Sequence, residues 1–139
     1  MSIKKNIYKA LLIILFAFVY SVEAAAATNR WWVADNDGTD KYWNNNANWS
    51  TTRYGSGGAS APTNNSFIAN FTDASTVDAK LSANVYKIRK LKVLNGYSGN
   101  INLNGYHLAS TQGPMINDGN ILVTAGSFFQ TWGWLYINT

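Results

Sequence analysis

The chain has 139 residues, of which 47% are hydrophobic and 13% charged, with no cysteine, one histidine and a formal net charge of +4. This length fits one domain, and the missing cysteines exclude disulfides, cysteine-ligated metal sites and thiol catalysis. A single histidine, His107, and seven acidic residues leave little material for a multi-histidine metal site or a carboxylate-based active site.

Residues 1–27 are expected to be a secretory signal peptide. Three lysines occur within the first ten residues, ten apolar residues fill 11–20, and small residues fill most of 21–27. This order is typical of export signals, and the apolar run is too short to cross a bilayer of about 30 Å as a helix. We therefore expect cleavage after Ala24 or Ala26, a secreted or outer-surface location, and no stable membrane insertion of the mature chain.

Export also explains part of the basic charge. Three of the eleven basic residues and one of the seven acidic residues lie within residues 1–27, so the net charge falls from +4 to +2 after cleavage. Four of the remaining basic residues form one cluster: Lys87, Arg89, Lys90 and Lys92. Because a charged outer strand face keeps a sheet edge soluble, we interpret the cluster as a solvated face and expect no nucleic acid partner.

Residues 28–74 form a region rich in tryptophan and asparagine. It holds four of the six tryptophans: Trp31, Trp32, Trp43 and Trp49. A glycine- and serine-rich loop at 53–63 contains a proline and breaks regular structure there. Asn64–Thr72, with three large apolar side chains, is predicted to contain a short strand.

The sequence Asp35-Asn36-Asp37-Gly38-Thr39-Asp40 is the acidic cluster of the chain. Oxygen ligands that alternate in a glycine-containing loop suit Ca²⁺, so Asp35, Asp37 and Asp40 are the candidate metal ligands. The glycine is at position 4 rather than 6 and no glutamate follows at position 12, so the loop departs from the EF-hand pattern. Aspartate and asparagine also favour plain turns, and we expect no other cofactor.

From residue 75 to 139 the sequence alternates between short apolar runs and turn signals. The predicted strands lie in 85–94, 100–104, 116–118, 120–124 and 134–138. Apolar residues that alternate between Asn-Gly or Asp-Gly turns indicate strands, and no window shows a sustained helical period. Within 85–94 the apolar side chains change phase, so we expect a bulge or corner near Arg89-Lys90.

Part of this region repeats. Gly99–Leu103 resembles Gly119–Val123 twenty residues later, and Gly133–Ile137 matches again after fourteen. One short strand and one turn in about twenty residues is typical of a β-solenoid, whose coils stack on one another. Asparagine at the turns would tolerate left-handed backbone and form ladders between coils. We predict an all-β fold, a short β-solenoid with an aromatic-rich N-terminal cap; the alternative is a β-sandwich of meandering hairpins.

A series of motifs follows a recognisable order between residues 31 and 73: Trp32-Val33, Asp35–Asp40, Trp43-Asn44, Asn48-Trp49-Ser50, Gly57-Gly58-Ala59, Pro62-Thr63 and Phe67–Phe71. In order and spacing the segment resembles the opening module of bacterial secreted surface proteins of the β-helix, autotransporter-passenger-like kind. The resemblance implies that residues 28–74 are the cap region of a solenoid whose coils continue through 75–139. It carries almost no information about activity.

Physical chemistry gives such a cap a role. The first coil of a solenoid exposes an apolar cross-section and unpaired strand edges, which tryptophans that bury about 150–250 Å² each could cover. The other end has no comparable cover, because the sequence ends at Thr139 within a predicted strand. We therefore expect the chain to be the N-terminal part of a longer protein, with end-to-end self-association of a short protein as the alternative.

Aromatic residues outside the expected cap core are the candidates for a binding site. They are Tyr42, Tyr54, Trp132 and Trp134, whose faces could stack on sugars beside asparagine amides. Surface glycans, or the surface of a host or neighbouring cell, are thus the expected partners. His107 has no acidic residue within ten positions and is interpreted as a surface residue near a turn.

These observations together predict a secreted or cell-surface structural protein, adhesin-like and not an enzyme. The alternatives are a carbohydrate-binding module of the cell surface and a fragment of a β-helix polysaccharide lyase or hydrolase. A polysaccharide-cleaving site would need clustered carboxylates, whereas Asp73, Asp78 and Asp118 are the only acids from residue 73 on.

Overall fold

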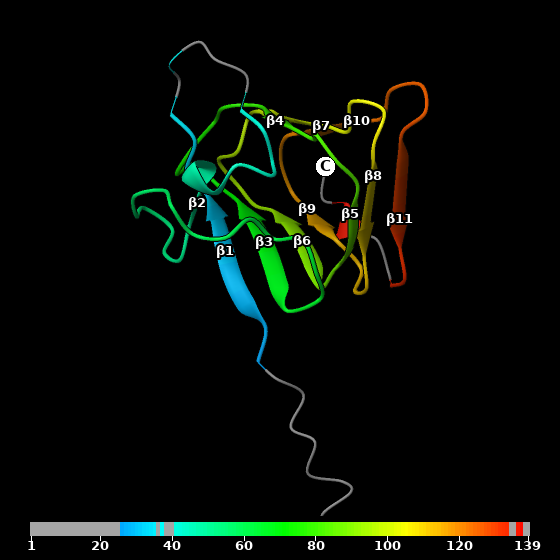
Figure 1. The fold of residues 1–139 in the computed structure, drawn as a ribbon, viewed down its shortest axis with the longest axis horizontal. Coiled ribbons are helices and arrows are strands. Elements are labelled where there is room, and N and C mark those ends of the chain that lie inside the picture. The colour runs from blue at the N-terminus through cyan, green and yellow to red at the C-terminus, as the bar shows by residue number, and fades with distance from the viewer. Residues whose placement is uncertain (1–25, 36, 38–40, 134–135, 138–139) are drawn as a thin grey trace, which may run out of the picture.

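Figure 1 shows the fold as a computed structural model, which describes residues 26–35, 37, 41–133 and 136–137. The described residues form twelve strands and one short 3-10 helix, η1 (Asn46–Asn48). The predicted all-β class is therefore confirmed. Most of the expected signal peptide lies outside the described residues. Among the residues that are described, no helix is long and apolar enough to cross a membrane.

The largest sheet, sheet A, contains six strands: β1 (Thr28–Trp32), β2 (Trp49–Ser50), β3 (Phe67–Phe71), β6 (Lys90–Val93), β9 (Met115–Ile116) and β12 (Tyr136–Ile137). Their order is β12-β9-β6-β3-β1-β2. Every neighbouring pair is parallel except β1 and β2, which run antiparallel. The antiparallel pair therefore occupies one edge of sheet A.

Two smaller sheets contain three parallel strands each. Sheet B consists of β4 (Ala79–Lys80), β7 (Asn100–Asn102) and β10 (Asn120–Leu122). Sheet C consists of β5 (Val85–Ile88), β8 (His107–Ser110) and β11 (Phe128–Thr131). In both sheets the strands lie side by side in chain order.

From β3 onward the chain visits the sheets in a fixed sequence, A then B then C. From β6 on, each strand therefore pairs with the strand three places before it, and Figure 1 shows the successive strands β1, β3, β6 and β9 of sheet A side by side. Paired residues are 20 to 23 positions apart, as in Ile101 with Ile121 and Leu108 with Phe129.

The twenty-residue repeat predicted from the sequence corresponds to paired strands. Asn100 lies opposite Asn120 in sheet B, and the residues that follow them pair in the same register. The third match, Gly133–Ile137, was wrong, because β12 belongs to sheet A and Ile137 lies opposite Ile116. Strands of all three sheets show the same alternation of apolar residues. The sequence pattern alone therefore does not predict which strands belong to the same sheet.

An aromatic cluster fills the core beside β1 and β2. Five aromatic side chains are fully buried there: Trp32, Trp43, Trp49, Phe71 and Tyr97. Neighbouring ring centroids in the cluster lie 5.0–5.6 Å apart in edge-on or tilted contacts. Each of the three indole N–H groups donates to a backbone carbonyl oxygen at 2.6–2.9 Å. Trp31, the remaining tryptophan of the expected cap, is only half-buried.

Aliphatic side chains continue the core along the chain. The fully buried ones include Leu81, Val85, Ile88, Leu91, Ile101, Leu103 and Leu108. Burial then declines, because the side chains of β10 and β11 are half-buried or exposed. The core is therefore densest near the aromatic cluster and thinnest at the last described strands of sheets B and C.

The phase change predicted between the residues of β5 and β6 is a corner between sheets C and A. The register of β5 shifts between Val85 and Ile88, and Lys87 has a φ of 61°, which marks a bulge. Arg89 forms a bend between the two strands. Both strands thereby keep their aliphatic side chains buried, so the predicted bulge or corner is confirmed.

Asparagine side chains link neighbouring strands of sheet B, as expected for turn asparagines. The Asn100 amide donates to both carboxylate oxygens of Asp78 at 3.1 Å, and the Asn120 amide donates to Asn100 Oδ1 at 3.3 Å. Asn104, in the turn after β7, has a φ of 49° in the left-handed region. Polar side chains thus connect three successive passes of the chain.

Candidate functional site

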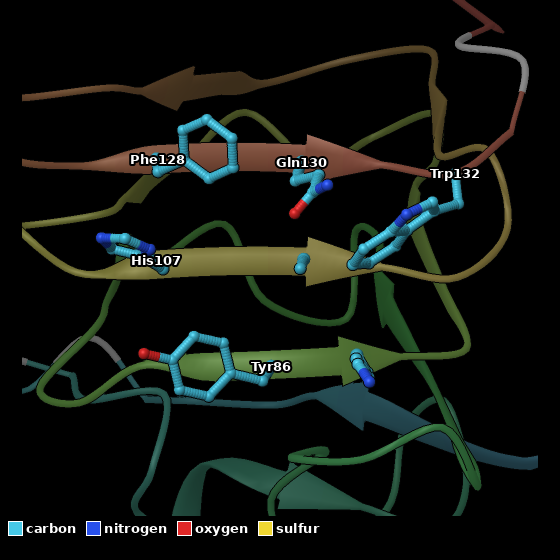
Figure 2. Close-up of a pocket in the computed structure, with 7 residues that line it drawn as sticks. Tyr86, His107, Phe128, Gln130 and Trp132 are labelled. Atoms are coloured by element: carbon cyan, nitrogen blue, oxygen red, sulfur yellow. The ribbon is translucent and has the colours of Figure 1, made fainter.

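The outer face of sheet C carries three aromatic side chains in a row. Tyr86 of β5, His107 of β8 and Phe128 of β11 follow one another across the parallel strands (Figure 2). Val85 and Leu108, their neighbours in the chain, are paired and fully buried. Phe129, the neighbour of Phe128, is paired with Leu108 and half-buried against the core. Since successive side chains of a strand point to opposite faces, the inward position of these neighbours directs the three rings outward. We call Tyr86, His107 and Phe128 the aromatic row.

The rings of the aromatic row contact one another. The ring centroids of Tyr86 and His107 are 6.2 Å apart, and those of His107 and Phe128 are 5.6 Å apart. Tyr86 is 56% exposed and Phe128 is 50% exposed. The row therefore presents a continuous aromatic surface to solvent, and aromatic rings contribute large contact areas to binding.

A depression lies beside the aromatic row and has a volume of about 330 Å³. Besides the row, its lining residues are Lys87, Ala109, Gln130 and Trp132. Ala109 and Gln130 are paired in register, and the small alanine side chain leaves room between the larger ones. Figure 2 shows Trp132 at the opposite end of the strands from the row. The volume is within the range of small-ligand sites, about 300–1,000 Å³.

The depression combines apolar walls with a few polar groups. Gln130 has an amide that can both donate and accept, and Lys87 supplies a positive charge. Among the described lining residues there is no carboxylate. The backbone N–H of His107 donates to Asn84 Oδ1 at 2.8 Å, which fixes the start of β8. Such a lining suits a ligand with apolar faces and a polar rim.

One of the aromatic residues selected from the sequence lines this depression, namely Trp132, which is 52% exposed. Tyr42 lies beside sheet B, where it bridges to Lys80, and the Lys80 ammonium is 5.9 Å from its ring centroid. Tyr54 is in the loop after β2 and is 70% exposed. Neither tyrosine lines the depression, and Trp134 lies outside the described residues.

Tyr54 belongs to a polar cluster around Asp73. Arg53 donates to Asp73 Oδ1 from Nη2 at 2.7 Å, and the Tyr54 hydroxyl donates to the same carboxylate at 3.2 Å. The hydrogen bond from Arg53, helped by that from Tyr54, lowers the pKa of Asp73 below its ordinary value. The cluster connects the loop after β2 to the turn after β3. These residues therefore stabilise the fold at this point.

The structure describes two of the three candidate calcium ligands, Asp35 and Asp37. Asp40 lies outside the described residues, and Asp35 is exposed. The Asp37 carboxylate forms an ion pair with the Lys41 ammonium at 2.6 Å. The described part of the chain contains no group of three or more candidate metal ligands. The calcium site thus stays a prediction from the sequence.

Sequence reasoning missed the aromatic row. His107 follows the turn at 104–105, as expected, but it is also the first residue of β8, which was not predicted. A signal was present, because Tyr86, His107 and Phe128 follow one another at a constant interval of 21 residues. The same interval separates the paired residues of β8 and β11. Between β5 and β8 the paired residues are 22 or 23 positions apart, so Tyr86 is not in register with His107. An aromatic residue that recurs near the pairing offset is thus the pattern that predicts a row on the sheet surface.

Comparisons of the chain with protein-family models, curated proteins and solved structures gave no match. The geometry of sheet C is therefore the basis for assigning a site. It offers a recognition surface of ring faces, one amide and one ammonium group, with an open hollow between them.

Proposed function

We propose that the chain is the capped N-terminal part of a β-solenoid and acts as a secreted or cell-surface structural protein, adhesin-like and non-catalytic. The observation that carries the proposal is the parallel pairing of every third strand at offsets of 20 to 23 residues. Stacked passes of about one repeat each are what a solenoid requires. A β-sandwich, the alternative fold, is built from antiparallel sheets instead.

The aromatic cluster supports the assignment of residues 28–74 as a cap. Three buried tryptophans lie beside the antiparallel pair β1 and β2, at the edge of sheet A. A terminal coil needs such cover, since it otherwise exposes apolar area and unpaired backbone groups. The resemblance of residues 31–73 to the opening modules of bacterial surface β-helix proteins favours the same assignment.

The partners of the acidic residues favour a scaffold over a polysaccharide-cleaving enzyme. Asp73 accepts from Arg53. Asp78 accepts from the backbone and the amide of Asn100, and Asp118 accepts from the Gly96 N–H at 2.9 Å. Each carboxylate thus joins neighbouring passes of the chain. Glycoside hydrolysis instead uses two carboxylates that flank one bond of the substrate.

Engineered disulfides test the stacking, because the chain contains no cysteine of its own. Lys80, Asn102 and Leu122 are paired in succession across β4, β7 and β10. Adjacent strands are about 4.8 Å apart, within the Cα separation of about 4.4–6.8 Å that a disulfide needs. We expect Asn102→Cys/Leu122→Cys to form an intramolecular disulfide under mild oxidation.

The matched control is Lys80→Cys/Leu122→Cys, whose residues are two strand spacings apart, about 10 Å, and should stay reduced. Non-reducing gels and mass spectrometry distinguish the two products. Efficient cross-linking of the control pair, or none in the paired one, would contradict the stacked arrangement.

Export and display are tested in the native host. We expect mass spectrometry to find the mature chain starting at Ala25 or Ala27, and protease treatment of intact cells to remove it. Loss of the gene should reduce attachment of the cells to surfaces. A chain that keeps residues 1–27 and stays in the cytosol, or a purified chain that cleaves polysaccharides, would refute the proposal.

A further inference from the structure

We propose that the outer face of sheet C binds a neutral glycan chain, which lies across the three strands with its sugar rings against the aromatic row. Trp132 bounds the opposite side of the site, and Gln130, which is paired with Ala109, lies between Trp132 and Phe128. The inference rests on the pairing within sheet C and on the exposed side chains there. It is therefore independent of the proposed scaffold role.

Exposure of these rings is unexplained by folding alone. Of the seven large hydrophobic residues that are exposed in the described part of the chain, three line this one depression: Tyr86, Phe128 and Trp132. The inward side of β5 and β8 is fully buried through Val85, Ile88 and Leu108, and Phe129 on the inward side of β11 is half-buried against the core. Because contiguous exposed apolar patches mark interaction sites, this outward grouping points to a ligand.

The chemistry of the lining matches a sugar ring. A pyranose has C–H groups on its faces and hydroxyls on its rim, and the negative face of an aromatic ring attracts the weakly positive C–H groups. Gln130 can donate to and accept from hydroxyls, and Lys87 can donate to them. The 5.6 Å and 6.2 Å steps between rings of the row allow successive sugars to meet successive rings.

Other extended ligands fit this face less well. A polyproline helix repeats every three residues, about 9 Å, which does not match ring steps of 5.6 Å and 6.2 Å. Single-stranded nucleic acid needs a positively charged groove along its backbone, and the described lining residues include one lysine, Lys87, and no arginine. That positive charge also disfavours a quaternary ammonium ligand, which aromatic cages bind. A single ammonium likewise matches a neutral glycan better than a polyanionic one.

Calorimetric titration of the purified mature chain tests the site. The probes are the neutral hexasaccharides of cellulose, xylan, β-1,3-glucan, mannan and chitin, with a proline-rich decapeptide and an oligo-dT strand as competitors of other classes. We expect saturable binding of at least one hexasaccharide. Tyr86→Ala and Phe128→Ala should each weaken it about tenfold, as expected for loss of one stacked ring.

A matched control is Tyr54→Ala, which removes a tyrosine that is more exposed than Tyr86 but lies away from the depression. The affinity of Tyr54→Ala for the hexasaccharide should stay within twofold of that of the unsubstituted chain. Ala109→Met fills the hollow without removing a ring and should also weaken binding. All four variants are checked for an unchanged melting temperature, so that loss of binding is not loss of the fold.

The proposal is overturned if no hexasaccharide binds, or if Tyr54→Ala weakens binding as much as Tyr86→Ala does. It is also overturned if the peptide or the oligonucleotide binds through the aromatic row while the sugars do not. Failure of this site leaves the disulfide result for Asn102 and Leu122 unchanged, so the two proposals fail separately.

Discussion

Tyr97 places a phenol inside the core. Its hydroxyl lies 3.0 Å from the Val77 carbonyl oxygen and 3.2 Å from that of Asn100, and its ring centroid is 5.0 Å from that of Phe71. Burial, together with the negative charge of Asp78, raises the pKa of Tyr97 far above its ordinary value of about 10. In the unfolded chain the pKa returns to that ordinary value.

This difference couples stability to alkaline pH. Below about pH 10 the phenol is neutral in both states, so its contribution to the free energy of unfolding is complete. Above that pH the unfolded chain releases the phenolic proton while the folded chain keeps it. The contribution is therefore lost progressively as the pH rises toward the raised pKa of the folded state.

Tyr97→Phe should destabilise the fold by about 1–2 kcal/mol at neutral pH, because the hydrogen bond from the phenol to the Val77 or Asn100 carbonyl oxygen is lost. It should also make the loss of stability above pH 10 shallower. Urea unfolding across a pH series measures both effects. Tyr86→Phe, at an exposed position, is the control and should change neither. An equally steep alkaline loss in Tyr97→Phe would contradict the assignment.

At the scale of strands and turns, tightly packed turns limit what the chain can accept. Gly119 precedes β10 with a φ of 65°, and a Cβ atom there would lie 2.8 Å from the Tyr97 ring and 2.9 Å from the Gly99 carbonyl oxygen. Gly105 has a similar positive φ of 82°, but its nearest neighbour would be 3.9 Å away. Substitution at Gly105 therefore tests backbone strain alone, whereas substitution at Gly119 tests the same strain together with steric crowding.

Gly105→Ala should cost about 1–2 kcal/mol, the strain of an L-residue in the left-handed region. Gly119→Ala should cost about 1–3 kcal/mol more, because overpacking is added to that strain. The midpoints and slopes of urea unfolding measure the difference. Equal losses of unfolding free energy in the two variants would contradict this expectation, because they would show that the turn before β10 rearranges to accommodate the added methyl group.

The strands also show which elements the sequence can predict. Alternating apolar residues before a glycine turn predicted the strands at β6, β7 and β10, and the phase change predicted the corner between β5 and β6. Strands β8 and β11 were not predicted. Their sequences, HLAS and FFQT, put polar or aromatic side chains outward without a clean alternation. Pairing with neighbours, rather than their own pattern, makes these segments strands.

The candidate site was predictable only in part, for the same reason. Trp132 was selected from the sequence because it is aromatic and lies outside the cap. The aromatic row required knowing that residues 21 to 23 positions apart become neighbours in sheet C. The depression further depends on the small side chain of Ala109, which carries no signal of its own until its register with Gln130 is known.

At the scale of the whole molecule, stability is concentrated around the aromatic cluster. Trp49 is fully buried against Trp32, Trp43 and Phe71, with ring centroids 5.0–5.5 Å away. Residues of β10 and β11 are much less buried. Removing an aromatic ring from the cluster should therefore lower the free energy of unfolding of the chain, whereas removing a ring near β11 should leave it almost unchanged.

Trp49→Ala should lower the free energy of unfolding by about 3–5 kcal/mol, the usual cost of deleting a buried aromatic ring. Trp132→Ala removes the same side chain from a half-exposed position and should change it by about 0.5 kcal/mol or less. Thermal and urea unfolding compare the two. A similar loss in both variants would contradict the central role of the aromatic cluster.

The constant interval in the aromatic row has a consequence for how such a protein can grow. Because paired residues of β8 and β11 are 21 positions apart, an in-frame duplication of one such unit would add a strand to each sheet and another ring to the row. Ligand valency would rise with gene length, and linked contacts multiply avidity without any new type of contact. Selection for tighter attachment could then act through copy number, leaving every individual binding residue unchanged.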